Sequence, residues 1–173
     1  MIVRHTLFFV TLVLVALSTQ HTLAALADEN YKQLVPLCPK AASLYANVTK
    51  VTEEAAAETN SATQQKLGLQ AMLLHSSEGN ALLDCGAKLI GKDSLKAGVL
   101  FSLAADSIYA AATVAHILGV DNRSTLANAF DAATDALEAL NDPSLAGNAS
   151  AAAERQYTEA TLNQIKNAES LGP

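Results

Sequence analysis

The chain has 173 residues, half of them hydrophobic, and its formal net charge at pH 7 is −6. Phosphate binding needs a basic patch, so this acidic balance excludes nucleic acid as an expected partner. Tryptophan is absent and only 8 glycines occur, whereas the abundant residue, alanine, has the highest helix propensity. No segment after the N-terminal region alternates β-branched or aromatic residues with polar ones, as strands would. The composition therefore predicts an all-α protein.

Residues 1–24 have the layout of a secretory signal peptide. Arg4 and His5 form a basic start, residues 7–17 are almost all apolar, and small residues at 22–24 or 25–27 suit a cleavage site. The apolar run is shorter than the roughly 20 residues that a membrane-spanning helix needs. We expect cleavage after Ala24 or Ala27, leaving residues 25–173 as one extracellular helical domain with a net charge of about −7.

Two cysteines, Cys38 and Cys85, remain in the exported chain. An oxidising compartment normally closes such a pair, so we predict one disulfide. Chain entropy for a loop of roughly 47 residues then corresponds to about 4 kcal/mol of stabilisation. Two buried free thiols are the alternative.

The first predicted helix starts near Pro39, because proline suits a first helical turn and an apolar stripe follows at spacings of three and four. We expect this helix to continue through residues 58–63, since no glycine or proline lies between Pro39 and Gly68. A turn within 58–63 is the alternative. A second hydrophobic block covers residues 67–90, with a break expected near Gly79 or Gly91.

Ser94 is the predicted N-cap of a strong helix that runs to Leu118. Gly119 follows where a left-handed C-terminal cap belongs. Because residues 95–118 are apolar around most of the helix, we expect this element to be the most buried one.

Two more helices follow, separated by turn chemistry. Residues 121–124 form a turn and cap, and the helix after them ends before Pro143. The linker 142–148 is rich in turn residues, and a last helix is predicted from about Ala151 to Ser170, presenting Tyr157, Ala160, Thr161, Leu162 and Ile165. The fold class predicted is an elongated up-and-down bundle of three to five helices.

Three N-glycosylation sequons are present, at Asn47, Asn122 and Asn148. Asn122 and Asn148 fall in predicted turns, where a glycan is readily solvated, whereas Asn47 falls inside a helix. We therefore expect modification at Asn122 and Asn148 more than at Asn47.

Few side chains are suited to catalysis. His75 and Glu78 have a spacing found in helical metal sites, but the further ligands are missing, so we interpret them as a partly exposed polar turn. His116 is expected to pack near a helix end and bond its terminal carbonyls. A row of carboxylates is interpreted as a solvated helix face, because calcium sites gather oxygens from a loop; it comprises Asp131, Asp135, Glu138 and Asp142. We predict no catalytic residue, cofactor or metal.

Several features occur together: Thr-Leu-Ala-Ala-Leu-Ala at 22–27, Cys38-Pro39 opening a long helix, alanine throughout, and Ala-Ala-Glu-Arg-Gln-Tyr-Thr-Glu-Ala at 152–160. In these the chain resembles the alanine-rich surface proteins of African trypanosomes, the brucei alanine-rich protein group allied to the glutamic acid and alanine-rich coat proteins. The resemblance implies a helical coat protein on a glycosylphosphatidylinositol anchor, without enzymatic activity. Residues 169–173 lack the hydrophobic tail that an anchor signal requires, so we expect membrane contact only through a lipid anchor that this chain does not encode.

The function expected is therefore that of a cell-surface or secreted coat glycoprotein that shields or displays, with neighbouring coat proteins or an unidentified extracellular protein as partners. The alternative is a secreted helical-bundle binding module, either an enzyme inhibitor or a ligand receptor. Plant invertase and pectin methylesterase inhibitors share this size and signal, but they typically carry four cysteines. An enzyme is the least favoured class, because few titratable groups are available to converge.

Overall fold

The computed structural model describes residues 35–170. Within this range the chain forms five α-helices and two short 3-10 helices, in the order η1 (Val35–Leu37), α2 (Pro39–Ala57), α3 (Ser61–Ala87), α4 (Ser94–Ile117), α5 (Arg123–Leu140), η2 (Pro143–Leu145) and α6 (Ala149–Ser170). The predicted signal peptide lies outside the described residues.

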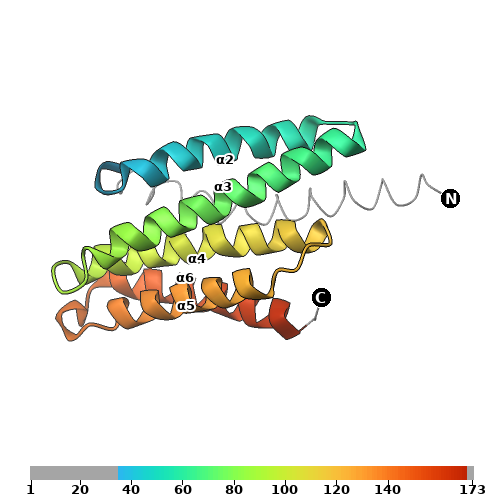
Figure 1. Ribbon diagram of the computed structural model, residues 1–173. Helices are drawn as coiled ribbons and strands as arrows, with labels where there is room; N and C mark the ends of the chain where they lie inside the picture. Colours follow the sequence, from blue (N-terminus) through green and yellow to red (C-terminus); the bar gives the residue numbers. More distant parts are fainter. Residues whose placement is uncertain (1–34, 171–173) are drawn as a thin grey trace.

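Helices that follow one another in sequence pack side by side in an elongated up-and-down arrangement (Figure 1). α2 and α3 form one side of the bundle, α4 occupies the middle, and α5 and α6 form the other side. α6 packs mainly on α5 and has a smaller contact with α4. The prediction of an all-α elongated bundle is confirmed.

α4 is the centre of the core. Its side chains at Leu100, Ala104 and Ala111 are fully buried, and α3, α5 and α6 all contact it. In the described range α4 is also the one helix long and apolar enough to cross a membrane, but most of it is buried inside the bundle. Burial on several sides explains why its sequence is apolar around most of its circumference.

The break between the first two helices is a correction to the sequence prediction. α2 ends at Ala57 and α3 begins at Ser61, so the helix does not continue through residues 58–63. The Asn60 side chain accepts hydrogen bonds from the Ala62 and Thr63 amides, both at 3.1 Å. The Gln64 side-chain amide donates to the Ala55 carbonyl, satisfying an end of α2. An asparagine cap can therefore start a helix where no glycine or proline stops the previous one.

Replacing Asn60 should test this cap directly. Asn60→Ala is expected to lower the free energy of unfolding by about 1 kcal/mol, because two amides of the first turn lose their acceptor. Asn60→Gly should lower the free energy of unfolding by only a few tenths of a kcal/mol, because glycine is tolerated at an N-cap. Urea denaturation followed by circular dichroism measures both; equal losses for the two variants would contradict the capping role.

The remaining boundaries mostly follow the local signals. The chain breaks after α3 at Gly91, which has a φ of 71°, whereas Gly79 lies inside α3. Gly119 has a φ of 69° and ends α4 as predicted. The N-cap of α4 is Asp93, whose carboxylate accepts from the Lys96 amide, so Ser94 is the first helical residue instead.

Candidate functional site

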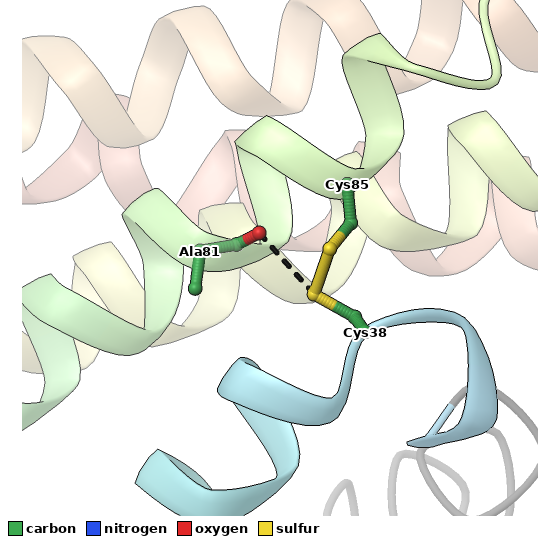
Figure 2. The surroundings of a disulfide bond; sticks show 3 residues. All are labelled: Cys38, Ala81 and Cys85. Carbon is green, nitrogen blue, oxygen red and sulfur yellow. Dashed lines mark hydrogen bonds between the residues drawn. A yellow bond between two sulfur atoms is a disulfide. The ribbon is translucent and has the colours of Figure 1, made fainter.

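The structure joins Cys38 and Cys85 in a disulfide with a Cα–Cα distance of 5.9 Å (Figure 2). The bond ties the start of α2 to the end of α3. Cys38 Sγ also lies 3.3 Å from the Ala81 carbonyl oxygen, which is a close contact, because an oxidised sulfur has no hydrogen to donate. The predicted pairing is therefore present, and it fastens the outermost helix to the bundle.

The three sequons differ in their surroundings. Asn47 is exposed on α2, and Asn148 is exposed in the turn before α6, where its side-chain oxygen accepts from the Ala151 amide. Asn122 is only 9% exposed, and its Nδ2 donates to the Ala112 carbonyl at 3.2 Å. Nδ2 is the atom to which an N-glycan is attached. The Asn122 side chain is therefore not solvated as its turn position predicts, because it folds back onto α4, and glycan occupancy at the three sequons stays a prediction.

His75 and Glu78 lie inside α3 instead of in a partly exposed turn. Glu78 is 2% exposed, and its Oε2 is 3.9 Å from His75 Nδ1. Burial lowers the pKa of His75 to about 4, so the imidazole is neutral at neutral pH. Within residues 35–170, no group of three or more His, Cys, Asp or Glu side chains is arranged to hold a metal ion. These two residues belong to the packing of α3.

His116 and the acidic row are at the surface. The His116 side chain is exposed in the last turn of α4, so the expectation that it packs there is wrong. Asp131, Asp135 and Glu138 are exposed along α5. Partial desolvation and the charges of the other two raise the pKa of Asp135. The solvated face predicted from sequence is present in these three residues.

Asp142, the fourth residue of the predicted acidic row, has a different role. It caps the η2 turn by accepting from the Ser144 amide at 2.8 Å. The Ser94 hydroxyl also donates to its other oxygen at 2.6 Å, which links the end of α5 to the start of α4. These hydrogen bonds lower the pKa of Asp142 to about 2.

The most unusual group of side chains lies where α6 meets α4. The buried positions of α6 recur at spacings of three and four, and three of these five residues are polar: Ala151, Glu154, Thr158, Thr161 and Ile165. They face polar groups of α4. We call this set the polar seam; it comprises Ser102 and Asp106 of α4 with Glu154, Tyr157, Thr158 and Thr161 of α6.

Asp106 is the centre of the polar seam. The Tyr157 hydroxyl donates to its Oδ2, and the Thr161 hydroxyl donates to its Oδ1 at 2.9 Å. Burial raises the pKa of Asp106 to about 6, partly offset by these two hydrogen bonds, and the nearby Glu154 charge raises it further. The pKa of Asp106 therefore lies above that of an ordinary aspartate.

One helical turn toward the start of α6, a second set of contacts continues the seam. The Thr158 hydroxyl donates to the Glu154 carbonyl at 2.8 Å and lies 3.0 Å from the Ser102 hydroxyl. Burial raises the pKa of Glu154, and a hydrogen bond with the Ser102 side chain partly offsets this. Burial and the neighbouring Asp106 raise the pKa of Tyr157 as well. The seam thus holds two carboxyl groups with raised pKa values, Asp106 and Glu154, between α4 and α6.

Sequence reasoning missed this seam. Asp106 is the single carboxylate within Ser94–Ile117, and that signal was available. The stripe predicted for the last helix included Thr161 and Ile165, which are buried, but also Ala160, which is exposed. A search for apolar stripes overlooks a buried face made of Glu and Thr, because those residues are normally placed at the surface.

Chemically, the seam joins α6 to α4 through hydrogen bonds between polar side chains. Its carboxyl and hydroxyl groups are engaged with one another at a helix interface. The chain matched no family model, no curated protein and no solved structure. The functional proposal therefore depends on the sequence features and on the geometry of the described residues.

Proposed function

We propose that this protein is a non-enzymatic exported glycoprotein that shields or displays at the cell surface, or is released from the cell. The observation that carries the proposal is that the buried titratable side chains take part in helix packing. His75 and Glu78 pack within α3, and the seam carboxyls hold α6 on α4. These titratable groups thus take part in the packing of a disulfide-linked helical bundle. The exposed surface carries sequons and a solvated acidic face.

The shape supports the same proposal. An elongated bundle of long helices extends further for its mass than a spherical domain, which suits close side-by-side display (Figure 1). Export and a coat role come from the signal peptide, the sequons and the resemblance to alanine-rich surface proteins of trypanosomes. The disulfide is in keeping with an oxidising compartment.

Glycan occupancy tests part of this proposal. When the chain is secreted from eukaryotic cells, Asn47→Gln and Asn148→Gln should each remove one glycan mass, because both side chains are exposed. Ser124→Ala destroys the Asn122 sequon without touching the buried amide, and we expect it to leave the glycan mass unchanged. Intact mass before and after enzymatic deglycosylation provides the measurement. Glycan loss with Ser124→Ala would contradict the assignment.

Labelling of intact source cells tests the display role. Antibodies raised against the folded oxidised domain should label the cell exterior as a dense, even layer in immunoelectron microscopy. Prior deglycosylation and a preimmune serum serve as controls for carbohydrate and background binding. Labelling confined to an internal compartment would refute the proposal.

A secreted binding module, either an enzyme inhibitor or a ligand receptor, is the second candidate. One observation favours it: Leu69 and Leu73, one turn apart on α3, are 38% and 62% exposed, and neighbouring exposed apolar residues mark contact sites. A stoichiometric partner recovered from the source's secretions should then be lost with Leu69→Ser and Leu73→Ser. Retention of that partner by both variants would argue against this surface.

A further inference from the structure

The connection between α3 and α4 carries two lysines at the surface of the bundle. This α3–α4 turn, residues 88–93, lies at one end of the molecule (Figure 1). Lys88, Ile90, Gly91 and Lys92 are exposed, and the apolar Ile90 side chain is 62% exposed. Gly91 has a φ of 71°, and a Cβ built there would meet nothing within 4 Å. The space around the tip of the turn is therefore open.

The hydrogen bonds of the α3–α4 turn are local. The amides of Lys92 and Asp93 both donate to the Leu89 carbonyl, and the Leu89 amide donates to the Gly86 carbonyl at the end of α3. The Lys92 ammonium donates to the Lys88 carbonyl. Leu89 is partly buried against the core and anchors the turn. Opening the turn costs these bonds and the packing of Leu89, whereas opening a helix costs a whole series of backbone bonds.

We propose that the α3–α4 turn is a processing site for a trypsin-like endopeptidase, which converts the protein into two chains held together by helix packing alone. Enzymes of this class bind a lysine or arginine side chain in a pocket that ends in a carboxylate, and exposed turns are where folded proteins are nicked. Water adds across the peptide bond after Lys88 or Lys92, leaving a carboxylate on that lysine and an amino group on the next residue. The inference does not depend on the display role proposed above.

The other basic residues of the described chain lie in helices, where a peptide bond reaches a protease only after the helix opens. They are Lys40, Lys50, Lys66, Lys96, Arg123, Arg155 and Lys166. Arg123, the first residue of α5, is also engaged, because its guanidinium donates to both oxygens of Asp121, at 3.0 and 2.7 Å. The other segments between helices, residues 58–60, 118–122 and 141–148, contain no lysine or arginine. The specificity of this enzyme class therefore selects the α3–α4 turn.

The position of the disulfide decides what the cut produces. Cys38 and Cys85 both precede the α3–α4 turn, so their bond lies within the first chain and does not join it to the second. The two chains then meet across the extensive interface of α3 with α4. In this interface Gly79 lies so close to Ile108 that a Cβ would approach its side chain to 2.4 Å. Apolar burial of this kind holds the two chains together without a covalent link.

Limited digestion of the full oxidised chain with trypsin tests the site. The first cut within residues 35–170 should fall after Lys88 or Lys92, as identified by intact mass. The two chains should then separate on a denaturing gel without reductant. A cut inside the disulfide loop, such as one after Lys50 or Lys66, would leave fragments joined until the bond is reduced. A first cut at any other residue of this range would overturn the proposal.

Measurements without denaturant test the two-chain product. Nicked protein should elute from a size-exclusion column together with the uncut protein. Its midpoint of urea unfolding should rise with protein concentration, because unfolding now releases two molecules, whereas the midpoint of the uncut chain should not. Separation of the two chains in the absence of denaturant would overturn the proposal.

Substitutions in the turn assign the cut. Lys88→Gln combined with Lys92→Gln removes both cleavage sites and keeps polar side chains, so the intact chain should survive about tenfold longer, since the next site requires a helix to open. Lys66→Gln changes an exposed lysine of α3 and should leave the lifetime unchanged. Circular dichroism should show equal helix content in all three proteins, and the mapping on unaltered protein does not depend on any variant. A double variant that is digested as fast as the unaltered chain would contradict the assignment.

Discussion

Removing the disulfide, with Cys38→Ala and Cys85→Ala combined, should lower the free energy of unfolding by about 4 kcal/mol. The bond closes a loop of 47 residues, and without it the unfolded chain gains conformational freedom. The effect should be felt most in α2, because that helix packs chiefly on α3 and has no other major neighbour among the described helices. Once the bond is lost, α2 is held mainly by its three buried residues, Ala41, Val48 and Val51, and by the partly buried Leu44 and Tyr45.

Guanidinium denaturation followed by far-UV circular dichroism measures this loss. Wild-type protein reduced with dithiothreitol is the matched control, and it should unfold at nearly the same midpoint as the double alanine variant. A second probe on α2, such as hydrogen exchange, should show that helix opening before α4. A loss below 1 kcal/mol would mean that the bond adds little beyond the packing of α2 on α3.

Replacing Gly79 by alanine should lower the free energy of unfolding by about 2 kcal/mol, although alanine is the better helix former. A Cβ at Gly79 would lie 2.4 Å from Ile108 Cγ1 and 3.2 Å from the Ala104 carbonyl oxygen, both on α4. Either the two helices must separate or Ile108 must leave its place in the core, where it is 3% exposed. Overpacking of this kind outweighs the roughly 1 kcal/mol of helix propensity that alanine adds.

Gly68→Ala is the matched control in the same helix. A Cβ there would lie 3.5 Å from the Leu118 side chain, an ordinary van der Waals distance. The variant should therefore raise the free energy of unfolding by up to about 1 kcal/mol through helix propensity. Thermal and urea unfolding of the two variants should give shifts of opposite sign. Stabilisation by Gly79→Ala would show that α3 and α4 are not packed this closely.

The same physics applies where Gly86 faces Phe101 and Gly98 faces Leu140. A Cβ at Gly86 would lie 2.7 Å from the Phe101 ring, and a Cβ at Gly98 would lie 2.5 Å from the Leu140 side chain. Glycines that look like weak points in the sequence of a helix are therefore places where neighbouring helices approach most closely. The sequence predicts a break near Gly79 or Gly91, and only Gly91, with its positive φ, forms one.

The sequence by itself determined the elements and most of their ends. Apolar stripes at spacings of three and four, Pro39 at a helix start and Gly119 at a helix end act within one or two turns of chain, so they can be interpreted without knowing any neighbour. The cysteine pair was predicted because the chain contains only two. An amide cap such as Asn60 acts equally locally, but the sequence prediction rested on the absence of glycine and proline and did not include it.

Only the tertiary structure decided which polar residues are buried. Asn122 lies in a turn that is typically solvated, yet its amide reaches the Ala112 carbonyl of α4. Glu154 and Thr158 are polar residues of the last predicted helix that the sequence analysis did not place in its stripe, and they are buried because α4 offers Ser102 at the matching level. Burial of a polar group requires a partner to replace water. That partner comes from a helix some fifty residues away in sequence, and no local pattern identifies it.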